Sequence, residues 1–194
     1  VVTAESMSVY SPQPPYDWLN ADEKYSWVKA PRYAGRPMEV GPLARTLVAY
    51  AQGSDRVREV VDSVLSQLDL EPAALFSTLG RTAGRGIETL LVAEQLEGWL
   101  DALINNVRAG DLRIHNGALW EPGSWPPEAR GWGRVEAPRG ALGHWVGIRD
   151  GAISHYQAVV PSTWNGSPRD PQGVRGPWEE ALIGTPVEDP ERPL

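Results

Sequence analysis

Two consecutive stretches of the 194-residue chain repeat apolar residues at the three-to-four-residue spacing of one helix face. In the first, the apolar positions are Val40, Leu43, Ala44, Leu47, Val48 and Ala51. In the second, they are Val57, Val60, Val61, Val64, Leu65 and Leu68. Pro42 lies in the first turn of the first helix, Gly53 follows its end, and Ser54 or Asp55 can cap the next. The pattern therefore predicts two amphipathic helices joined by a short turn.

A third and longer helical pattern runs to about Val107, after a turn around residues 69–72. Its apolar positions are Leu75, Leu79, Ala83, Ile87, Leu90, Leu91, Leu100, Leu103, Ile104 and Val107. At 1.5 Å per residue this predicts a rod of roughly 50 Å. Gly80, Gly84 and Gly86 interrupt it at up to ~1 kcal/mol each. Glycines four residues apart on one face allow another backbone to come close. Arg81 and Arg85 share this spacing, and either a solvated face or a buried polar role is open to them.

After residue 109 the pattern changes to turns and strands. NGALWEPGSWPPEARGWG is typical of a turn-rich loop. HWVGIRDGAISHYQAVV predicts a β-hairpin around Asp150–Gly151, a favoured two-residue turn. That turn sets three pairs: Arg149 with Ala152, Trp145 with Tyr156, and His144 with Gln157. RVEA, just before, can add a third strand, and a short helix is expected near residues 178–182 of an irregular tail.

Together these patterns predict an α+β fold that is mainly α, in one domain. We expect an extended, proline- and aromatic-rich segment over residues 1–38 and a helical bundle with one long helix over residues 39–109. Residues 110–194 then contribute a small antiparallel β-hairpin or sheet, long Pro- and Trp-rich loops, and an irregular tail.

Composition narrows the classes of function. With 41% hydrophobic and 22% charged residues the chain has a globular composition. Its net charge of −7, with acids and bases mixed, argues against a nucleic-acid surface, which needs a basic stripe. The chain has no cysteine, so it supplies no disulfide, thiolate metal ligand or cysteine nucleophile. Nine tryptophans against one phenylalanine favour a large, irregular packing surface over a sugar-binding aromatic platform.

Two segments concentrate the candidate chemistry. In RVEAPRGALGHW, Arg139 lies in a tight turn, and Glu136 is its only evident partner nearby. In AVVPSTWN, an apolar strand ends at Pro161 and two hydroxyl residues follow. Donors gathered at a strand end suit an anionic or strongly accepting ligand. A simple strand-terminating turn is the other interpretation of AVVPSTWN.

The histidines and serines are weaker candidates. In the predicted register, His144 and His155 lie on one face as diagonal neighbours, ~7–8 Å apart at Cα. Further metal ligands at a suitable spacing are missing, so hydrogen-bonded histidines are the favoured interpretation. Ser154, His155 and Asp150 lack a nucleophile elbow. GRTAGRG has no preceding strand, so it does not predict a phosphate-binding loop.

Three segments, in order, closely resemble the large subunit of nickel–iron hydrogenases, nearest to the uptake, membrane-associated type. They are EKYSWVKAPRYAGRPMEVGPLAR, WEPGSWPPEARGWGRVEAPRGALGHW and HYQAVVPSTWNGSPRD. The resemblance extends from about Tyr16 to Leu194. It implies that the helices belong to the family's central bundle and that the hairpin belongs to the small sheet beside its active site.

The resemblance also implies the activity and the partners. The family's enzyme oxidises H2 reversibly to protons and electrons, which pass to an iron–sulfur small subunit. Packing of the Trp-rich loops within the large subunit and against that small subunit is expected. A membrane cytochrome b, reached through the small subunit, and a place at the cell membrane on the periplasmic side are also implied.

The family's metal centre is Ni–Fe(CO)(CN)2, held by two Cys-x-x-Cys pairs near the two ends of the subunit. This chain has neither pair, so we interpret it as an internal fragment that contributes no nickel ligand and is inactive by itself. A fragment that only binds proteins and holds no metal, and an aromatic sugar-binding domain, are the alternative hypotheses.

The resemblance assigns roles to individual residues around that centre. Pro138, Arg139 and Gly140 match the family's Pro-Arg-Gly element, whose arginine lies over the metals and helps to split H2. Val160, Pro161, Ser162 and Thr163 match its Val-Pro-Ser-Thr element, in which the serine and nearby backbone donate to a cyanide nitrogen. The backbone carbonyl of Ala158 matches a ligand of the family's Mg²⁺ or iron ion.

Overall fold

The computed structural model describes residue 26 and residues 28–118, 120–170, 172–187, 189 and 191. Most of the expected extended segment, residues 1–38, lies outside these residues. The elements, in order, are helices α1 (Pro42–Ala51) and α2 (Asp55–Gln67), the 3₁₀ turn η2 (Pro72–Phe76), helix α3 (Thr78–Arg108), the 3₁₀ turn η3 (Pro122–Ser124), strands β1 (Glu128–Ala137), β2 (Gly140–Arg149) and β3 (Ala152–Val159), and helices α4 (Pro161–Asn165) and α5 (Pro177–Leu182). This arrangement confirms the predicted α+β fold.

The first two predicted helices are confirmed as α1 and α2. Pro42 is the first residue of α1, where its missing N–H has no helical partner to lose. Gly53 follows α1 with a φ of 88°, and Ser54 precedes the first residue of α2. The apolar faces of both helices meet in a core that also receives η2 and α3. The buried members of this core are Leu43, Val57, Val60, Val61, Leu65, Leu75 and Ile87.

The third helical pattern is split into two elements. Leu75, expected in the long helix, lies in η2, and Ser77 separates η2 from α3. The Ser77 hydroxyl accepts a hydrogen bond from the Gly80 N–H at 3.0 Å, which caps α3 and explains the break. The expected close approach of a backbone at the glycines is confirmed, because a Cβ on Gly84 would lie 3.2 Å from the Leu43 Cα.

The strands form one antiparallel sheet in the order β1-β2-β3 within the described residues. The third strand suggested by RVEA is confirmed, but it starts earlier, at Glu128. The prediction of a loop throughout NGALWEPGSWPPEARGWG is therefore wrong for residues 128–133. This part of β1 contains two glycines, which are unfavourable in strands. It is nevertheless a strand, because it pairs along its whole length with β2.

The hairpin between β2 and β3 turns at Asp150–Gly151 as predicted, with Arg149 opposite Ala152. Beyond the turn the predicted register is wrong, because Ser154 is an extra residue on β3 between the pairs Ile148–Ile153 and Gly147–His155. Such a β-bulge shifts every later pair by one. Trp145 consequently pairs with Gln157, Val146 with Tyr156, and His144 with Ala158.

The bulge also separates the two hairpin histidines. His144 and Gly147, the partner of His155, are three residues apart on β2, so the two imidazoles lie on opposite faces of the sheet. His144 Nδ1 forms a hydrogen bond with the Tyr156 hydroxyl, as expected for a satisfied histidine. His155 Nε2 is buried and has no hydrogen-bond partner within the described part of the chain. The expectation of hydrogen-bonded histidines is thus confirmed for His144 and wrong for His155.

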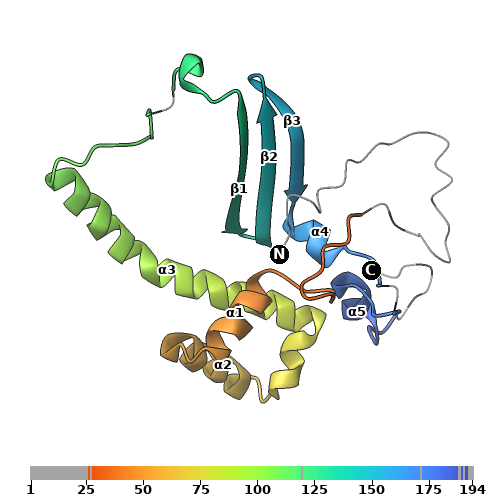
Figure 1. Cartoon of the computed structure of the whole chain (residues 1–194). Helices are drawn as coiled ribbons and strands as arrows, with labels where there is room; N and C mark the ends of the chain where they lie inside the picture. The colour runs from red at the N-terminus through yellow and green to blue at the C-terminus, as the bar shows by residue number, and fades with distance from the viewer. Residues whose placement is uncertain are drawn as a thin grey trace.

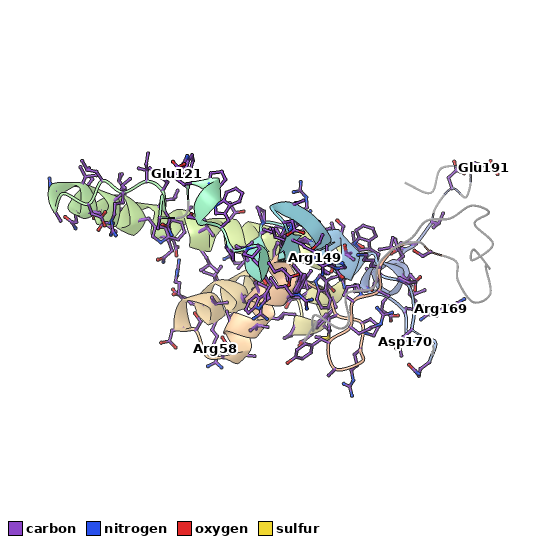
Figure 2. The ribbon with its side chains drawn as sticks, turned by 45° about the horizontal axis from the view of Figure 1, so that its top comes forward. Arg58, Glu121, Arg149, Arg169, Asp170 and Glu191 are labelled. Carbon is purple, nitrogen blue, oxygen red and sulfur yellow. The ribbon has the colours of Figure 1, made fainter. Side chains whose placement is uncertain are left out.

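Figure 1 shows the helices α1, α2 and α3 below one end of the sheet, with α4 leaving the same end of β3. The short helix expected in the tail is confirmed as α5. Between α4 and α5 the chain turns around Asp170, whose Oδ1 accepts from the N–H groups of Gln172 (2.9 Å) and Val174 (2.8 Å). Figure 2 labels Asp170 in this loop, Arg149 on the sheet and Arg58 on α2. No helix in the described ranges is both long enough and apolar enough to cross a bilayer.

Candidate functional site

The Pro138–Arg139 pair forms the two-residue turn between β1 and β2, with Ala137 paired to Gly140. The backbone at the start of α1 contacts this turn directly. A Cβ on Gly140 would lie 2.8 Å from the Gly41 nitrogen, and one on Gly41 would lie 2.9 Å from the Arg139 carbonyl oxygen. Both glycines also have positive φ, 128° at Gly41 and 135° at Gly140. Only glycine fits both the space and the conformation, so this contact fixes the turn against the helices.

Arg45, on α1, holds the same turn from the side. Its Nη1 donates to the Ala137 carbonyl and its Nη2 to the Pro138 carbonyl, both at 3.0 Å. Nη1 also donates to Glu136 at 2.8 Å, while Nε and Nη2 contact the two carboxylate oxygens of Glu88 on α3 at 2.5 and 2.7 Å. The hydrogen bond to Glu88, followed by that to Glu136, raises the pKa of Arg45 above its already high usual value. Arg45 is thus a permanent cation shared by α1, α3 and the turn.

The guanidinium of Arg139 has a contrasting environment. Its side chain is exposed, and within the described part of the chain it makes no hydrogen bond or ion pair. Glu136, the partner that the local sequence offers, is bound to Arg45 instead. Arg139 lines a cavity of about 90 Å³ between the turn, α1, α3, α4 and α5. The donors of Arg139 are therefore free to bind a group from outside the described residues.

Arg81 and Arg85 of the long helix also line this cavity, with different roles. Arg81 forms a fork with the Glu39 carboxylate, through Nε at 2.9 Å and Nη2 at 2.7 Å, and its side chain is largely buried. Arg85 is exposed. The buried polar role is therefore confirmed for Arg81 and the solvated role for Arg85.

The second predicted site element forms the start of α4. The strand ends at Val159, two residues earlier than expected, and Pro161 is the buried first residue of a short helix. The Val160 N–H donates to the Thr163 hydroxyl oxygen at 3.3 Å. Ser162 is exposed, and among the described residues its hydroxyl has no hydrogen-bond partner. The strand is thus followed by a short helix, which starts at Pro161 and is held by the Thr163 contact.

Asn165 connects α4 to the start of α1. Its Oδ1 accepts from the Val40 N–H at 2.9 Å, and its Nδ2 donates to the Val40 carbonyl at 2.8 Å. Val40 and Gly41 are therefore bound by α4 on one side and contact the Pro138–Arg139 turn on the other. This brings both predicted elements to the same end of the sheet (Figure 1). Ala158 lies on the adjoining part of β3, opposite His144 and partly buried.

The donor set at this end is suited to an anion rather than to a metal ion. Arg139 and Ser162 present a guanidinium and a hydroxyl, both of which donate hydrogen bonds. The described residues contain no group of three histidine, aspartate or glutamate side chains that could hold a metal ion, and the whole sequence has no cysteine. The described residues therefore present hydrogen-bond donors, rather than a cluster of metal ligands, at this end of the sheet.

Sequence reasoning missed the residues that build this arrangement, namely Gly41, Arg45, Glu88 and Asn165. Gly41 and Asn165 lie within the segments that resemble the family, so their positions were marked, although their contacts were not. Nothing in the local sequence distinguished Glu88, because it is one of several acidic residues outside the apolar face of a helical pattern.

Known proteins with similar sequences belong to one family. Residues 3–194 match the family described as nickel-dependent hydrogenase. The uptake hydrogenase large subunit of Bradyrhizobium diazoefficiens is 52% identical over 176 residues, which cover 91% of this chain and 30% of that protein. The hydrogenase-1 large chain of Escherichia coli K12 has the same identity and coverage.

Solved structures of hydrogenases are also similar to this chain. The Ni-Fe-Se hydrogenase of Desulfovibrio vulgaris Hildenborough matches with a TM-score of 0.65 and 38% identity, over 88% of this chain and 34% of that one. The reduced, active form of the enzyme from Desulfomicrobium baculatum matches with a TM-score of 0.66 and 36% identity, over 96% of this chain and 36% of that one.

The chain belongs to the nickel-dependent hydrogenase family. Within that family it is similar to the large subunits of uptake hydrogenases and spans about 30% of their length. The resemblance stated from the sequence is confirmed.

Proposed function

We propose that the chain is part of the catalytic large subunit of a nickel–iron hydrogenase of the uptake type, which oxidises H2 reversibly to protons and electrons. One observation supports this above the others. The free donors of Arg139 and Ser162 lie at the same end of the sheet, on two elements that are both bound to the Val40–Gly41 backbone.

The residues fit a Ni–Fe(CO)(CN)2 centre through its diatomic and sulfur ligands. When bound, the centre supplies the metals at which H2 is split and oxidised. Ser162 would donate its hydroxyl hydrogen to a cyanide nitrogen, with Val160 and Pro161 beside it. Arg139, following Pro138, would place a fixed positive charge and a planar set of donors next to the anionic centre, where they stabilise charge that develops during the splitting of H2. Such outer contacts orient metal ligands and tune the metals.

We further propose that the backbone carbonyl of Ala158 is a ligand of the Mg²⁺ or iron ion of the subunit. A main-chain oxygen is an acceptable ligand for Mg²⁺, which prefers oxygen donors. Its remaining ligands lie outside this chain.

The exposed apolar surface supports a role within a larger assembly. On α3, a stripe at helical spacing is exposed; it consists of Val92, Leu96, Trp99, Leu103 and Val107. Trp120 and Trp132 are also exposed, on the loop before β1 and on β1 itself. We propose that the rest of the large subunit and an iron–sulfur small subunit cover these surfaces. Passage of electrons through the small subunit to a membrane cytochrome b, on the periplasmic side, belongs to the same proposal and is supported by the similarity to uptake hydrogenases.

The function is tested by Arg139→Lys in the intact hydrogenase. Lysine keeps the charge but loses the planar fork, so H2 oxidation should fall about 100-fold, the scale for loss of a preorganised donor. Nickel and iron contents should be unchanged, since Arg139 contacts no metal directly. Near-normal turnover would contradict the role given to Arg139.

The contact of Ser162 has a separate spectroscopic test. In Ser162→Ala the cyanide nitrogen loses a hydrogen-bond donor, so the cyanide stretching bands in the infrared should shift, while the carbon monoxide band moves less. Thr163→Ser is the matched control, because it retains the hydroxyl that accepts from the Val160 N–H. Unchanged cyanide bands in Ser162→Ala would remove Ser162 from this environment.

A fragment that only binds proteins is the second candidate. The exposed apolar stripe of α3 favours it for the chain in isolation. Nickel content distinguishes the two candidates. A large subunit that includes this segment should contain nickel, whereas a fragment that only binds proteins should not. Among the described residues the exposed tryptophans form no continuous platform for a sugar, since they are dispersed over α3, the loop before β1, β1 and α5.

A further inference from the structure

We propose that Arg45 is a positioning residue that fixes the Pro138–Arg139 turn and keeps the Arg139 guanidinium free to act. The proposal rests on the function proposed above for Arg139. Arg45 itself does not reach the free end of the Arg139 side chain; it acts through the backbone that carries Arg139 and through the carboxylates near it.

The first step of the argument is the number of hydrogen bonds. A guanidinium has five N–H donors in one plane. Arg45 directs five contacts to five different oxygen atoms, on Glu88, Glu136, Ala137 and Pro138. Every donor of Arg45 is thus in use, whereas Arg139 has no partner among the described residues. Arg45 and Arg139 therefore have different roles: Arg45 holds the structure, and Arg139 is available to a ligand from elsewhere.

The second step is the position of the two backbone contacts. The Pro138 carbonyl belongs to the peptide unit that contains the Arg139 nitrogen, and the Ala137 carbonyl belongs to the unit before it. Since a peptide unit is planar, a hydrogen bond to the Pro138 oxygen also fixes the orientation of the Arg139 nitrogen and Cα. Arg45 thereby sets the direction in which the Arg139 side chain leaves the turn.

The third step is electrostatic. Glu136 is the carboxylate nearest to Arg139 in the sequence. Without Arg45 it would be available to Arg139. Arg45 donates a hydrogen bond to the Glu136 carboxylate at 2.8 Å. It also forms a two-point contact with the Glu88 carboxylate. Two-point contacts between guanidinium and carboxylate are among the strongest hydrogen-bonded pairs in proteins. Arg45 therefore competes with Arg139 for Glu136, the nearest carboxylate in the hairpin of Arg139.

The experiment uses the intact hydrogenase with Arg45→Lys, measured in the normal background and in an Arg139→Lys background. Lysine keeps the charge but cannot make five planar contacts. We expect turnover to fall about 10-fold in the normal background, the effect of one lost hydrogen bond from a charged donor. In the Arg139→Lys background the same substitution should change turnover less than about 2-fold, because a residue that acts through Arg139 has nothing left to position.

A readout independent of turnover is amide hydrogen exchange of the peptide that covers residues 136–142. Arg45→Lys should increase exchange there about 10-fold and leave the peptides of α2 unchanged. Arg56→Lys is the matched control, since Arg56 also makes a fork between two helices, to Glu94 on α3, but contacts no part of the turn. If Arg45→Lys prevents assembly, Glu88→Gln is the milder variant, and it should weaken the same peptide's protection and turnover in the same direction.

Two results would overturn the proposal. Equal loss of turnover in both backgrounds would show that Arg45 acts on stability in general, and unchanged exchange at residues 136–142 would show that it does not hold the turn. Failure of the proposed function has a different signature, namely near-normal turnover of Arg139→Lys itself. Increased exchange would then describe a structural clamp without a catalytic purpose, and the positioning role would be overturned with the function.

Discussion

The two halves of α3 have similar apolar content but opposite surroundings. In the first half, Gly80, Gly84 and Ile87 are buried against η2 and α1. In the second half, side chains as large as Trp99 and Leu103 are more than half exposed. Figure 1 shows the second half extending away from α1 and the sheet. An apolar helix face in the sequence therefore predicts that some element packs on that face. Which element packs there is seen only in the tertiary structure.

The largest expected effect contrasts one apolar side chain from each half. Ile87 is 3% exposed, so Ile87→Ala should lower the free energy of unfolding of the chain by about 2–5 kcal/mol, through lost burial and a residual cavity. Leu100 is 56% exposed, and Leu100→Ala should cost less than about 1 kcal/mol. Denaturant unfolding followed by circular dichroism measures both. Equal losses would show that the second half is packed as tightly as the first.

A second contrast uses glycines. In Gly80→Ala the new Cβ would lie 2.3 Å from the Ala74 carbonyl oxygen, so backbone must move, and we expect a loss of about 1–3 kcal/mol. Gly98 has nothing within 4 Å of the same position, and Gly98→Ala should stabilise the chain by up to about 1 kcal/mol through helix propensity. The same unfolding experiment decides the sign. Stabilisation by Gly80→Ala would contradict the close contact between η2 and α3.

The smallest effect concerns the ion pair that connects α2 to the boundary between the two halves. Hydrogen bonding to Arg56 lowers the pKa of Glu94 below its usual value of 4.5. A carboxylate with a lowered pKa in the folded state stabilises the fold above its unfolded pKa, and this contribution disappears as the pH falls through the folded pKa. The stability difference between the normal chain and Arg56→Met should therefore be present at pH 7 and vanish in acid.

Arg85→Met is the control for this measurement. Arg85 lies on the same helix, and the described residues include no acid paired with it. Its substitution should leave a stability difference that does not change between pH 7 and acid. A pH-independent difference for Arg56→Met as well would show that Glu94 is not stabilised by the pair.

The local elements were predictable because their causes are local. The boundaries of α1 and α2 follow from Pro42 and Gly53 and from apolar residues at helical spacing. The turn at Asp150–Gly151 follows from the conformational freedom of glycine. The bulge at Ser154 has no comparable signal, because no glycine or proline marks it in AISHYQAV, so only strand pairing revealed the true register.

The site divides in the same way. Arg139 and Ser162 could be proposed as functional residues from the sequence, because they lie in segments that resemble the hydrogenase family. The sequence by itself determined that this chain supplies no thiolate ligand, because it contains no cysteine. The tertiary structure was needed to show that Glu136 and Glu88 bind Arg45 and that Asn165 binds Val40. It was also needed to show that Arg139 is unpaired among the described residues. The physical reason is that each carboxylate could pair with several arginines, and the choice depends on distances set by packing of elements far apart in the chain.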